Sequence, residues 1–366
     1  MLTPHLPNRR RFGVVLLALC ALVLSGCVEA GSDVTAADKP KAGADEFLPL
    51  LDEGSGEPSQ EIQDAAAKEG GLVWYDSSTQ EQAAQIMKAF QRKYPFIKEV
   101  SHVQLVAGDI ATRVVQEDQS GRSTADVVSN AAELMTPLDE RGLIAPLEAD
   151  KLAMPSDLVA GDLAVTSTTA YGIQYNTKLV AAQDVPKTWD DLLDPKWKGK
   201  IGLWSLPAPL VNLVPTWGGD ETQSFVKSLM AQQPQVFQSV FEMTSAISSG
   251  QLPLGIGVDR LTSIAKAQGA PTDFAAADPL SVSVLYSAVV QGGANPNAAR
   301  LFISWLDSAE GAKAQEDATG RANPQVPGTK VRDEYQGKNL SGWPPGNTDQ
   351  VKEWADAFTE LIQAAG

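Results

Sequence analysis

Cysteine and histidine are almost missing from this chain of 366 residues, which holds two of each. Cys20 lies in an N-terminal stretch that we expect to be removed, and Cys27 directly follows that stretch, so no internal disulfide is expected. His5 lies in the same stretch, which leaves His102 as the single histidine of the expected mature chain. One imidazole excludes a metal site built from several histidines and weakens any histidine-based acid–base scheme. We therefore expect His102 to be structural or exposed.

The sequence also lacks the short motifs of common catalysts. It contains no Gly-x-x-x-x-Gly-Lys-Ser/Thr phosphate loop and no Gly-x-Ser-x-Gly nucleophile elbow. Paired acids do occur, as at Asp190-Asp191 and Glu316-Asp317, but neighbouring side chains on a helix point in different directions. Such pairs are typical of a solvated surface. We therefore predict a binding protein without a cofactor rather than an enzyme.

Positive charge is scarce, because 29 lysines and arginines face 45 aspartates and glutamates, for a net charge of −16. So acidic a chain binds nucleic acid poorly and is repelled by anionic lipid. Solubility explains the acidity more simply than a role in attracting cations. Nucleic acid is thus excluded as a partner.

The longest apolar run is too short to cross a membrane. It extends over thirteen residues from Phe12 to Leu24, whereas a membrane-spanning helix needs roughly 20. Arg9-Arg-Arg11 precedes the run and Leu24-Ser-Gly-Cys27 ends it, an arrangement that resembles a bacterial lipoprotein signal peptide covering residues 1–26. The resemblance implies that Cys27 becomes the first residue, is acylated, and anchors an extracytoplasmic protein to the cell membrane. An ordinary signal peptide with a coincidental cysteine is the alternative.

Beyond this leader, residues 27–59 show no sustained apolar period and predict a flexible tether. Strand-like and helix-like segments then alternate. Leu72 to Tyr75 is a continuous apolar run typical of a strand buried on both faces, and residues 83–94 carry a single apolar stripe. The alternation predicts an α/β fold with a mostly parallel sheet flanked by helices.

Hydroxyl groups are concentrated where the first of these strands meets its helix. Ser77, Ser78 and Thr79 occupy this junction, where backbone N–H groups of a helix N-terminus are suited to an anion or a carbonyl group. We predict these three residues as ligand contacts, although local helix capping explains them equally well. Asn130 follows a later buried strand in the same way and is a further candidate.

The middle of the chain carries the most specific motifs. They are Tyr175-Asn-Thr-Lys178, Val185-Pro-Lys-Thr-Trp-Asp-Asp-Leu192, Asp194-Pro-Lys-Trp-Lys-Gly-Lys-Ile201 and, further on, the run from Asn295 to Gly311. In this order they resemble the extracellular solute-binding proteins of ABC importers. The branch that they match best is the ferric-iron-binding-like group of the type II periplasmic-binding-protein fold. The resemblance extends over roughly residues 60 to 330.

The resemblance implies two α/β lobes that are joined by two crossing strands and close on a solute. The first lobe would comprise residues 60–170 and 286–330, and the second residues 171–285 and 331–366, with Tyr171–Asn176 in a crossing strand. The implied role is a monomeric receptor that delivers its solute to a permease and an ATPase.

The chain departs from the family pattern where iron would bind. The tandem tyrosines of the iron-binding members fall on Arg260-Leu261 here, the early histidine near Thr79, and the acid near Ala131 unless Glu133 takes its place. Pro207-Ala-Pro209 replaces an anion-binding Ser-Gly-Ala, and proline has no N–H to donate. Losing the phenolates removes most of the hard oxygen ligands that iron(III) requires.

The residues that remain near these positions favour an organic anion or a zwitterion. Arginine binds an anionic group through two parallel hydrogen bonds, and a neighbouring carboxylate accepts from an amine. The predicted ligand contacts in the second lobe are Trp204, Ser205, Asp259 and Arg260. A surface ion pair is the alternative for the last two, and a place in the core is the alternative for the tryptophan. Iron(III) with a synergistic anion, and an enzyme on the same fold, remain the alternative functions.

Overall fold

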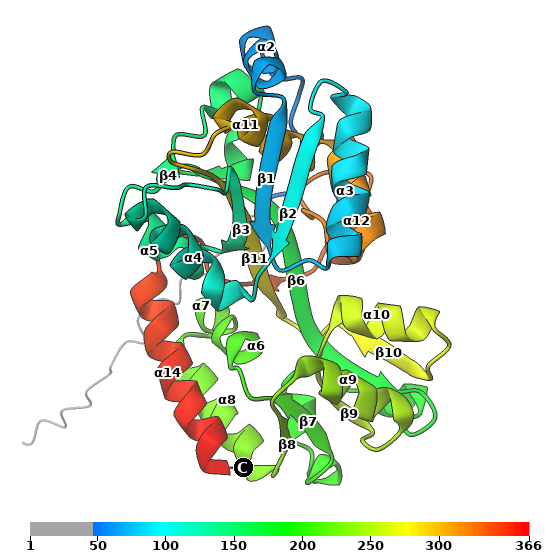
Figure 1. The fold of residues 1–366 in the computed structure, drawn as a ribbon. Helices are drawn as coiled ribbons and strands as arrows, with labels where there is room; N and C mark the ends of the chain where they lie inside the picture. Colours follow the sequence, from blue (N-terminus) through cyan, green and yellow to red (C-terminus); the bar gives the residue numbers. More distant parts are fainter. Residues whose placement is uncertain (1–46, 366) are drawn as a thin grey trace, which may run out of the picture. The chain divides into compact units, whose positions relative to one another are not determined.

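The computed structural model describes residues 47–365, and a single mixed sheet runs through this part of the chain in the order β2-β1-β3-β11-β6-β9-β7-β8 (Figure 1). Its strands lie at β1 Gly71–Asp76, β2 Glu99–Gln104, β3 Val127–Ala131, β6 Leu163–Asn176, β7 Ile201–Trp204, β8 Gln235–Phe237, β9 Leu254–Val258 and β11 Leu280–Val290. Short strands β4 Ile144–Ala145, β5 Val159–Ala160, β10 Thr272–Ala275 and β12 Leu340–Ser341 pair with β6 or β11. The expected α/β class is confirmed.

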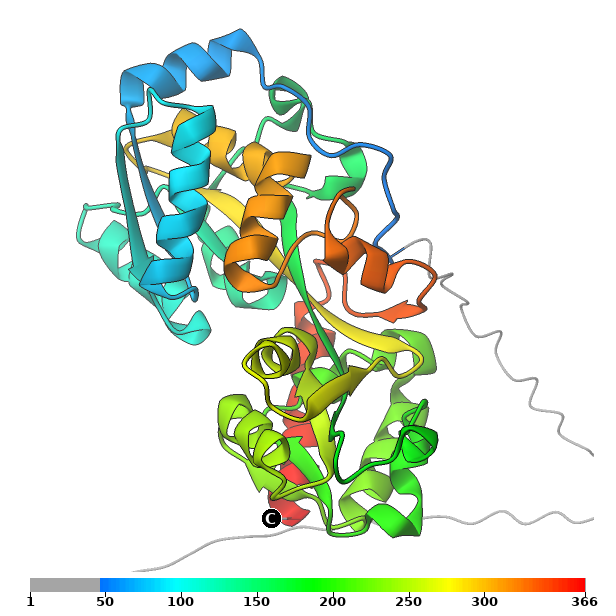
Figure 2. The same ribbon diagram turned by 90° about the vertical axis from the view of Figure 1, so that its right-hand side faces the viewer.

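Helices pack against the sheet in two groups, one on each side of the long central strands β6 and β11. They are α2 Gln60–Glu69, α3 Gln80–Lys93, α4 Ala107–Gln119, α5 Ala132–Asp139, α6 Ala208–Val211, α7 Val214–Trp217, α8 Gly219–Ala231, α9 Val240–Ser249, α10 Asp259–Ala267, α11 Pro296–Leu306, α12 Ala309–Thr319, α13 Lys330–Tyr335 and α14 Thr348–Ala365. Figures 1 and 2 show α2–α5, α11 and α12 around β1–β3, and α6–α10 around β7–β9, with most of α14 alongside α8. We call these groups the first and the second half.

The strand pairing explains the two groups. β1 is parallel to β2 and to β3, and β7 is parallel to β8 and to β9. β6 joins them, because its earlier residues pair with β11 and its last residues, from Tyr171, pair with β9 and β10. Parallel strands of one sheet present their carboxyl ends, and the loops that follow, at one edge. The loops of the first half and of the second half therefore face each other across β6 and β11.

Each half has its own hydrophobic clusters. In the first half, Phe90 packs edge-on against Phe302, and Trp305 stacks on Phe302 at a centroid distance of 6.1 Å. In the second half, Trp189 and Phe225 form the centre of another cluster around β7 and β9. Separate cores of this kind are what a chain of this length usually builds.

The central sequence motifs are structural. Asn176 donates from Nδ2 to the Ile247 carbonyl at 2.8 Å and accepts from the backbone N–H of Lys178 at 2.9 Å. Trp189 is fully buried and donates from its indole to the Pro279 carbonyl at 2.8 Å. Asp191 accepts from two backbone N–H groups, which lower its pKa. These motifs fix the turns after β6 rather than contact a solute.

The expected flexible tether does not extend to Ser59. Leu48 is 4 % exposed and belongs to a core cluster, Leu51 donates from its N–H to the Gln325 carbonyl, and Ser55 donates to the Asp307 carbonyl at 2.8 Å. The apolar side chains of this segment bury themselves on the first half, although they follow no regular period. The remainder of the tether, Cys27 and the expected signal peptide lie outside the described residues. Within the described part, no helix combines the length and apolarity that crossing a membrane requires.

Candidate functional site

A cavity of about 550 Å³ opens between the two halves, within the range of small-molecule sites. The first half contributes the loop after β1, the start of α3 and the residues that follow α12. The second half contributes α9 and α10. Residues lining the cavity include Ser77, Ser78, Thr79, Gln82, Gln104, Phe241, Ser245, Arg260, Leu261, Ile264, Gln268 and Arg321.

The predicted hydroxyl cluster lines this cavity, but part of it serves helix capping. Thr79 and Gln82 form a reciprocal capping box at the start of α3. The Ser78 hydroxyl is buried and donates to Asp76 at 2.6 Å, while Ser77 is exposed. Ser77 is therefore the residue of the three whose hydroxyl is most available, and the capping explanation holds for Ser78 and Thr79.

Asp76, the last residue of β1, holds this loop in place through hydrogen bonds. Its carboxylate also accepts from the backbone N–H of Ser78 at 2.9 Å and lies 2.7 Å from Nε2 of His102. The His102 side chain is 3 % exposed and packs against the ring of Trp74. The single described histidine thus orients a carboxylate and does not reach the cavity, in line with the structural role that we expected.

Two arginines provide the charge of the cavity. Arg260 is the second residue of α10, and Arg321 follows Gly320, which ends α12 in the left-handed conformation at φ +70°. Neither guanidinium has an ion-pair partner among the described residues, and Nε of each is buried without a hydrogen-bond partner. Burial and the charge of Arg321 lower the pKa of Arg260 to about 10. Burial also lowers the pKa of Arg321.

Arg321 was missed by the sequence analysis. A lone arginine in a loop between a helix and a proline-containing segment carries no motif, and only the fold brings it beside Arg260. These two are the charged residues among those that line the cavity, which include no lysine, aspartate or glutamate. A positively charged cavity in a chain with a net charge of −16 is suited to an anion.

Asp259 is not among the residues that line this cavity. It lines a separate hollow of about 340 Å³, together with Lys266, Asp273, Glu334 and Lys338. The carboxylate accepts from the backbone N–H of Arg260 at 2.6 Å but forms no side-chain ion pair. Burial raises the pKa of Asp259 to about 7, with a further increase from Glu334. The structure therefore does not bring Asp259 and Arg260 together as one amphoteric ligand site.

Asp259→Asn is expected to stabilise the protein at high pH and not at low pH. A carboxyl whose folded pKa exceeds its unfolded pKa leaves stability intact at low pH and reduces it as pH rises toward the folded pKa. The variant should exceed the wild type by about 1–3 kcal/mol at pH 8 and match it near pH 4. Urea denaturation at both values measures this, and a gain of equal size at pH 4 would contradict the ionisation argument.

The other predicted contacts do not line the cavity. Asn130 is buried, donates to the Ala107 carbonyl at 2.7 Å and accepts from the N–H of Ala131, so it fixes the loop after β3. Trp204 packs with Tyr171 and Leu261 in a small cluster. Ser205, at the end of β7, is half-buried and donates its N–H to the Phe237 carbonyl. Trp204 is half-buried, and a ligand contact through its ring stays a prediction.

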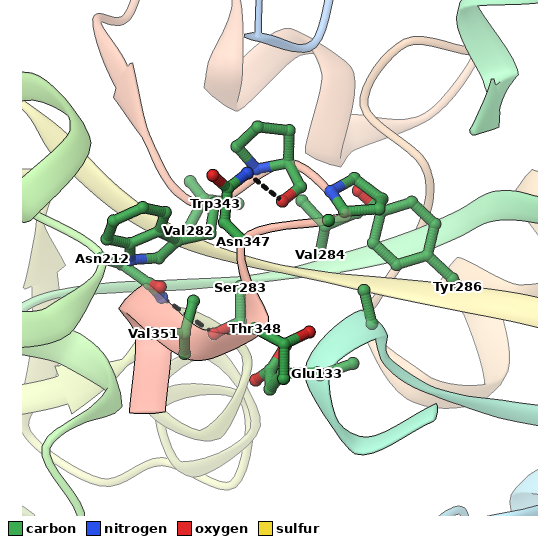
Figure 3. A pocket seen from close by; sticks show the side chains of 15 residues that line it. Glu133, Asn212, Val282, Ser283, Val284, Tyr286, Trp343, Asn347, Thr348 and Val351 are labelled. Carbon is green, nitrogen blue, oxygen red and sulfur yellow. Dashed lines mark hydrogen bonds between the residues drawn. The ribbon is translucent and has the colours of Figure 1, made fainter. Parts of the chain in front are cut away.

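Another, much smaller hollow lies beside β11, with a volume of about 20 Å³ (Figure 3). Asn212 donates to the Ser283 hydroxyl at 2.9 Å on one side of it, and Glu133, whose pKa is raised by burial, lies on the other. This volume is enough for about one water molecule. We therefore place the candidate site in the cavity that Arg260 and Arg321 line.

The described residues contain no group of three or more histidines, cysteines, aspartates or glutamates placed to hold a metal ion. The cavity lining also contains no tyrosine, whose phenolate is a hard oxygen ligand for iron(III). Guanidinium groups repel a cation. The donor set of the cavity therefore does not fit iron.

Comparison with known proteins gives one family and one fold. The family model for "bacterial extracellular solute-binding protein" matches residues 122–357. An uncharacterised protein of Haemophilus influenzae is 24% identical over 273 residues, which cover 68% of this chain and 76% of that protein.

Two solved structures are similar along nearly their whole length. Iron-bound HitA from Pseudomonas aeruginosa is 21% identical with a TM-score of 0.64, and the match covers 81% of this chain and 99% of HitA. AfuA from Actinobacillus pleuropneumoniae, with fructose-6-phosphate bound, is 20% identical with a TM-score of 0.63, covering 80% and 99%. Both are two-lobed periplasmic binding proteins, which confirms the expected two-lobed fold.

Proposed function

The chain belongs to the bacterial extracellular solute-binding proteins, the substrate-binding components of ABC importers, and from this premise we propose that its solute is a small organic anion. The pair of arginines in the cavity between the halves supports this proposal. Both lack an ion-pair partner among the described residues, and no acidic side chain lines the cavity. A buried charge without a partner is costly, so a ligand that neutralises it gains affinity from the pairing.

The ligands of the structural relatives differ, and the side chains favour one type over the other. AfuA is named with a sugar phosphate bound and HitA with iron. An anionic ligand fits two guanidiniums. Iron(III) does not, because it is repelled by their positive charge and finds no phenolate ligand in the cavity. We therefore place an organic anion ahead of iron, which was the alternative from the sequence.

We further propose that the two halves are lobes that close on the solute by rotating about β6 and β11. The lobes would comprise residues 60–170 with 286–330, and 171–285 with 331–366. Such hinge closure needs only a few strand or loop residues to change conformation. The protein would capture its solute without altering it, and a closed pair of lobes would present the solute to a permease that works with an ATPase.

The family places the protein outside the cytoplasm. We propose that lipid on Cys27 attaches it to the membrane as a monomer. The segment between Cys27 and Leu48, the first buried residue of the described part, would then form the tether.

The test is to identify what the purified protein retains. We expect mass spectrometry of the denatured protein to detect an organic anion, and the same anion unchanged after prolonged incubation with fresh protein. Ferric iron added to the protein should give no phenolate-to-metal absorption band. Recovery of iron, of a cation or of a neutral sugar as the sole bound solute would overturn the proposal, and conversion of the anion would indicate an enzyme.

A further inference from the structure

Arg260 and Arg321 reach the cavity from opposite halves. α10, which carries Arg260, packs on β6 and β10 in the second half, while α12, which precedes Arg321, packs on α3 and α11 in the first. The two segments are in contact, since a Cβ added to Gly320 would lie 3.3 Å from Cβ of Arg260. The fold thus holds two cationic side chains near each other at the boundary between the halves.

Both nearby carboxylates are engaged elsewhere. Asp76 lies behind the wall of the cavity, where Ser78 and His102 occupy its oxygens. Asp259 accepts from a backbone N–H and lines the other hollow. Neither forms an ion pair with Arg260 or Arg321, although the charge of Asp259 on both arginines and of Asp76 on Arg321 partly opposes the lowering of the arginine pKa values by burial. A direct partner for the two guanidiniums in the cavity is therefore left to the ligand.

We propose, on the premise that the cavity captures an organic anion, that the anionic group is a phosphoryl dianion bridging Arg260 and Arg321. A phosphate monoester or a phosphonate carries about two negative charges at neutral pH and has three terminal oxygens. Two planar guanidiniums each donate a pair of parallel hydrogen bonds to such a group. A carboxylate has two oxygens and one charge, and leaves one arginine unpaired.

The other residues that line the cavity indicate the chemistry of the rest of the ligand. Gln104, Ser245 and Gln268 present exposed amide and hydroxyl groups, and Phe241 and Ile264 add exposed apolar surface. None of these side chains is charged. The body attached to the phosphoryl group is therefore uncharged and carries hydroxyl groups, and the bridge between the arginines draws the two halves together.

Methyl phosphate and methyl sulfate give a direct test, because they share a tetrahedral shape and differ by one charge at pH 8. Isothermal titration of the purified protein should show methyl phosphate binding at least 30-fold more tightly than methyl sulfate. Arg321→Gln should reduce this preference below threefold, with the monoanion still bound through Arg260. Arg122→Gln, which removes a charge from an exposed position, should leave the preference unchanged.

Urea denaturation of each variant checks that it folds. Arg321→Lys provides a second variant, which keeps the positive charge but cannot donate two parallel hydrogen bonds. We expect it to keep an intermediate preference. Equal binding of the two probes by the wild type, binding of neither, or full preference in Arg321→Gln and Arg321→Lys would each overturn the dianion site. The wider proposal is judged separately, since a retained carboxylate would satisfy it and not this one.

Discussion

Arg260→Met is expected to weaken binding of the retained anion at least 100-fold and to leave the unliganded protein as stable as the wild type or more stable. The loss corresponds to about 2.8 kcal/mol, within the range for removing one partner of a buried charged contact. The unliganded protein loses no ion pair, because Arg260 has none among the described residues. The substitution also removes the repulsion between Arg260 and Arg321 and the cost of burying a guanidinium. We therefore expect the free energy of unfolding without ligand to rise by about 1 kcal/mol.

Two measurements on the same variant separate function from stability. Isothermal titration gives the affinity for the anion that the wild type retains, and urea denaturation without ligand gives the free energy of unfolding. Arg122→Met, on the exposed surface, should change neither by more than about 0.5 kcal/mol. An affinity within threefold of the wild type, or a loss of stability similar to the loss of affinity, would assign Arg260 a structural role.

The fold was largely predictable because its signals are local. Leu72 to Tyr75 lies in the buried strand β1, and the apolar stripe that starts at Ala83 is buried along α3 and ends at its C-cap, Tyr94. Tyr171–Asn176 pairs with β9 and β10, as a strand entering the second half should. The packing of residues 47–59 was not predictable, because a few apolar side chains without a period find their partners only in the finished core.

The site was predictable only in part, because it depends on long-range contacts. The strand-to-helix junction led to Ser77, Ser78 and Thr79, which do line the cavity because carboxyl ends of parallel strands meet at one edge, while their contact with a ligand stays a prediction. Asp259 and Arg260 are adjacent in sequence, which suggested a shared ligand site. At the start of α10, however, Arg260 lines the cavity and Asp259 lines a different hollow. Arg321 lies 61 positions after Arg260, and nothing in the sequence around it indicates that α12 ends beside α10.

Gly311→Ala is expected to cost more than about 4 kcal/mol and to prevent folding at 37 °C. Gly311 is buried in the first turn of α12, and a Cβ there would lie 1.7 Å from the backbone oxygen of Trp305. The obstacle is backbone, so no side-chain rotation relieves it and α12 must move away from α11. α11 carries Phe302 and Trp305 into the main cluster of the first half. The displacement therefore reaches both the core and, through Gly320, the position of Arg321.

Gly108→Ala is the matched control, because Gly108 also lies in the first turn of a helix, α4, and a Cβ there would meet nothing within 4 Å. We expect this variant to fold normally and to gain up to about 1 kcal/mol, since alanine restricts the unfolded chain. Soluble yield and urea denaturation compare the two variants. A Gly311→Ala protein whose free energy of unfolding lies within 1 kcal/mol of the wild type would show that α12 is not held against α11 as closely as the structure has it. The coupling from this helix pair to Arg321 would then lose its basis, because the same contact fixes where α12 ends.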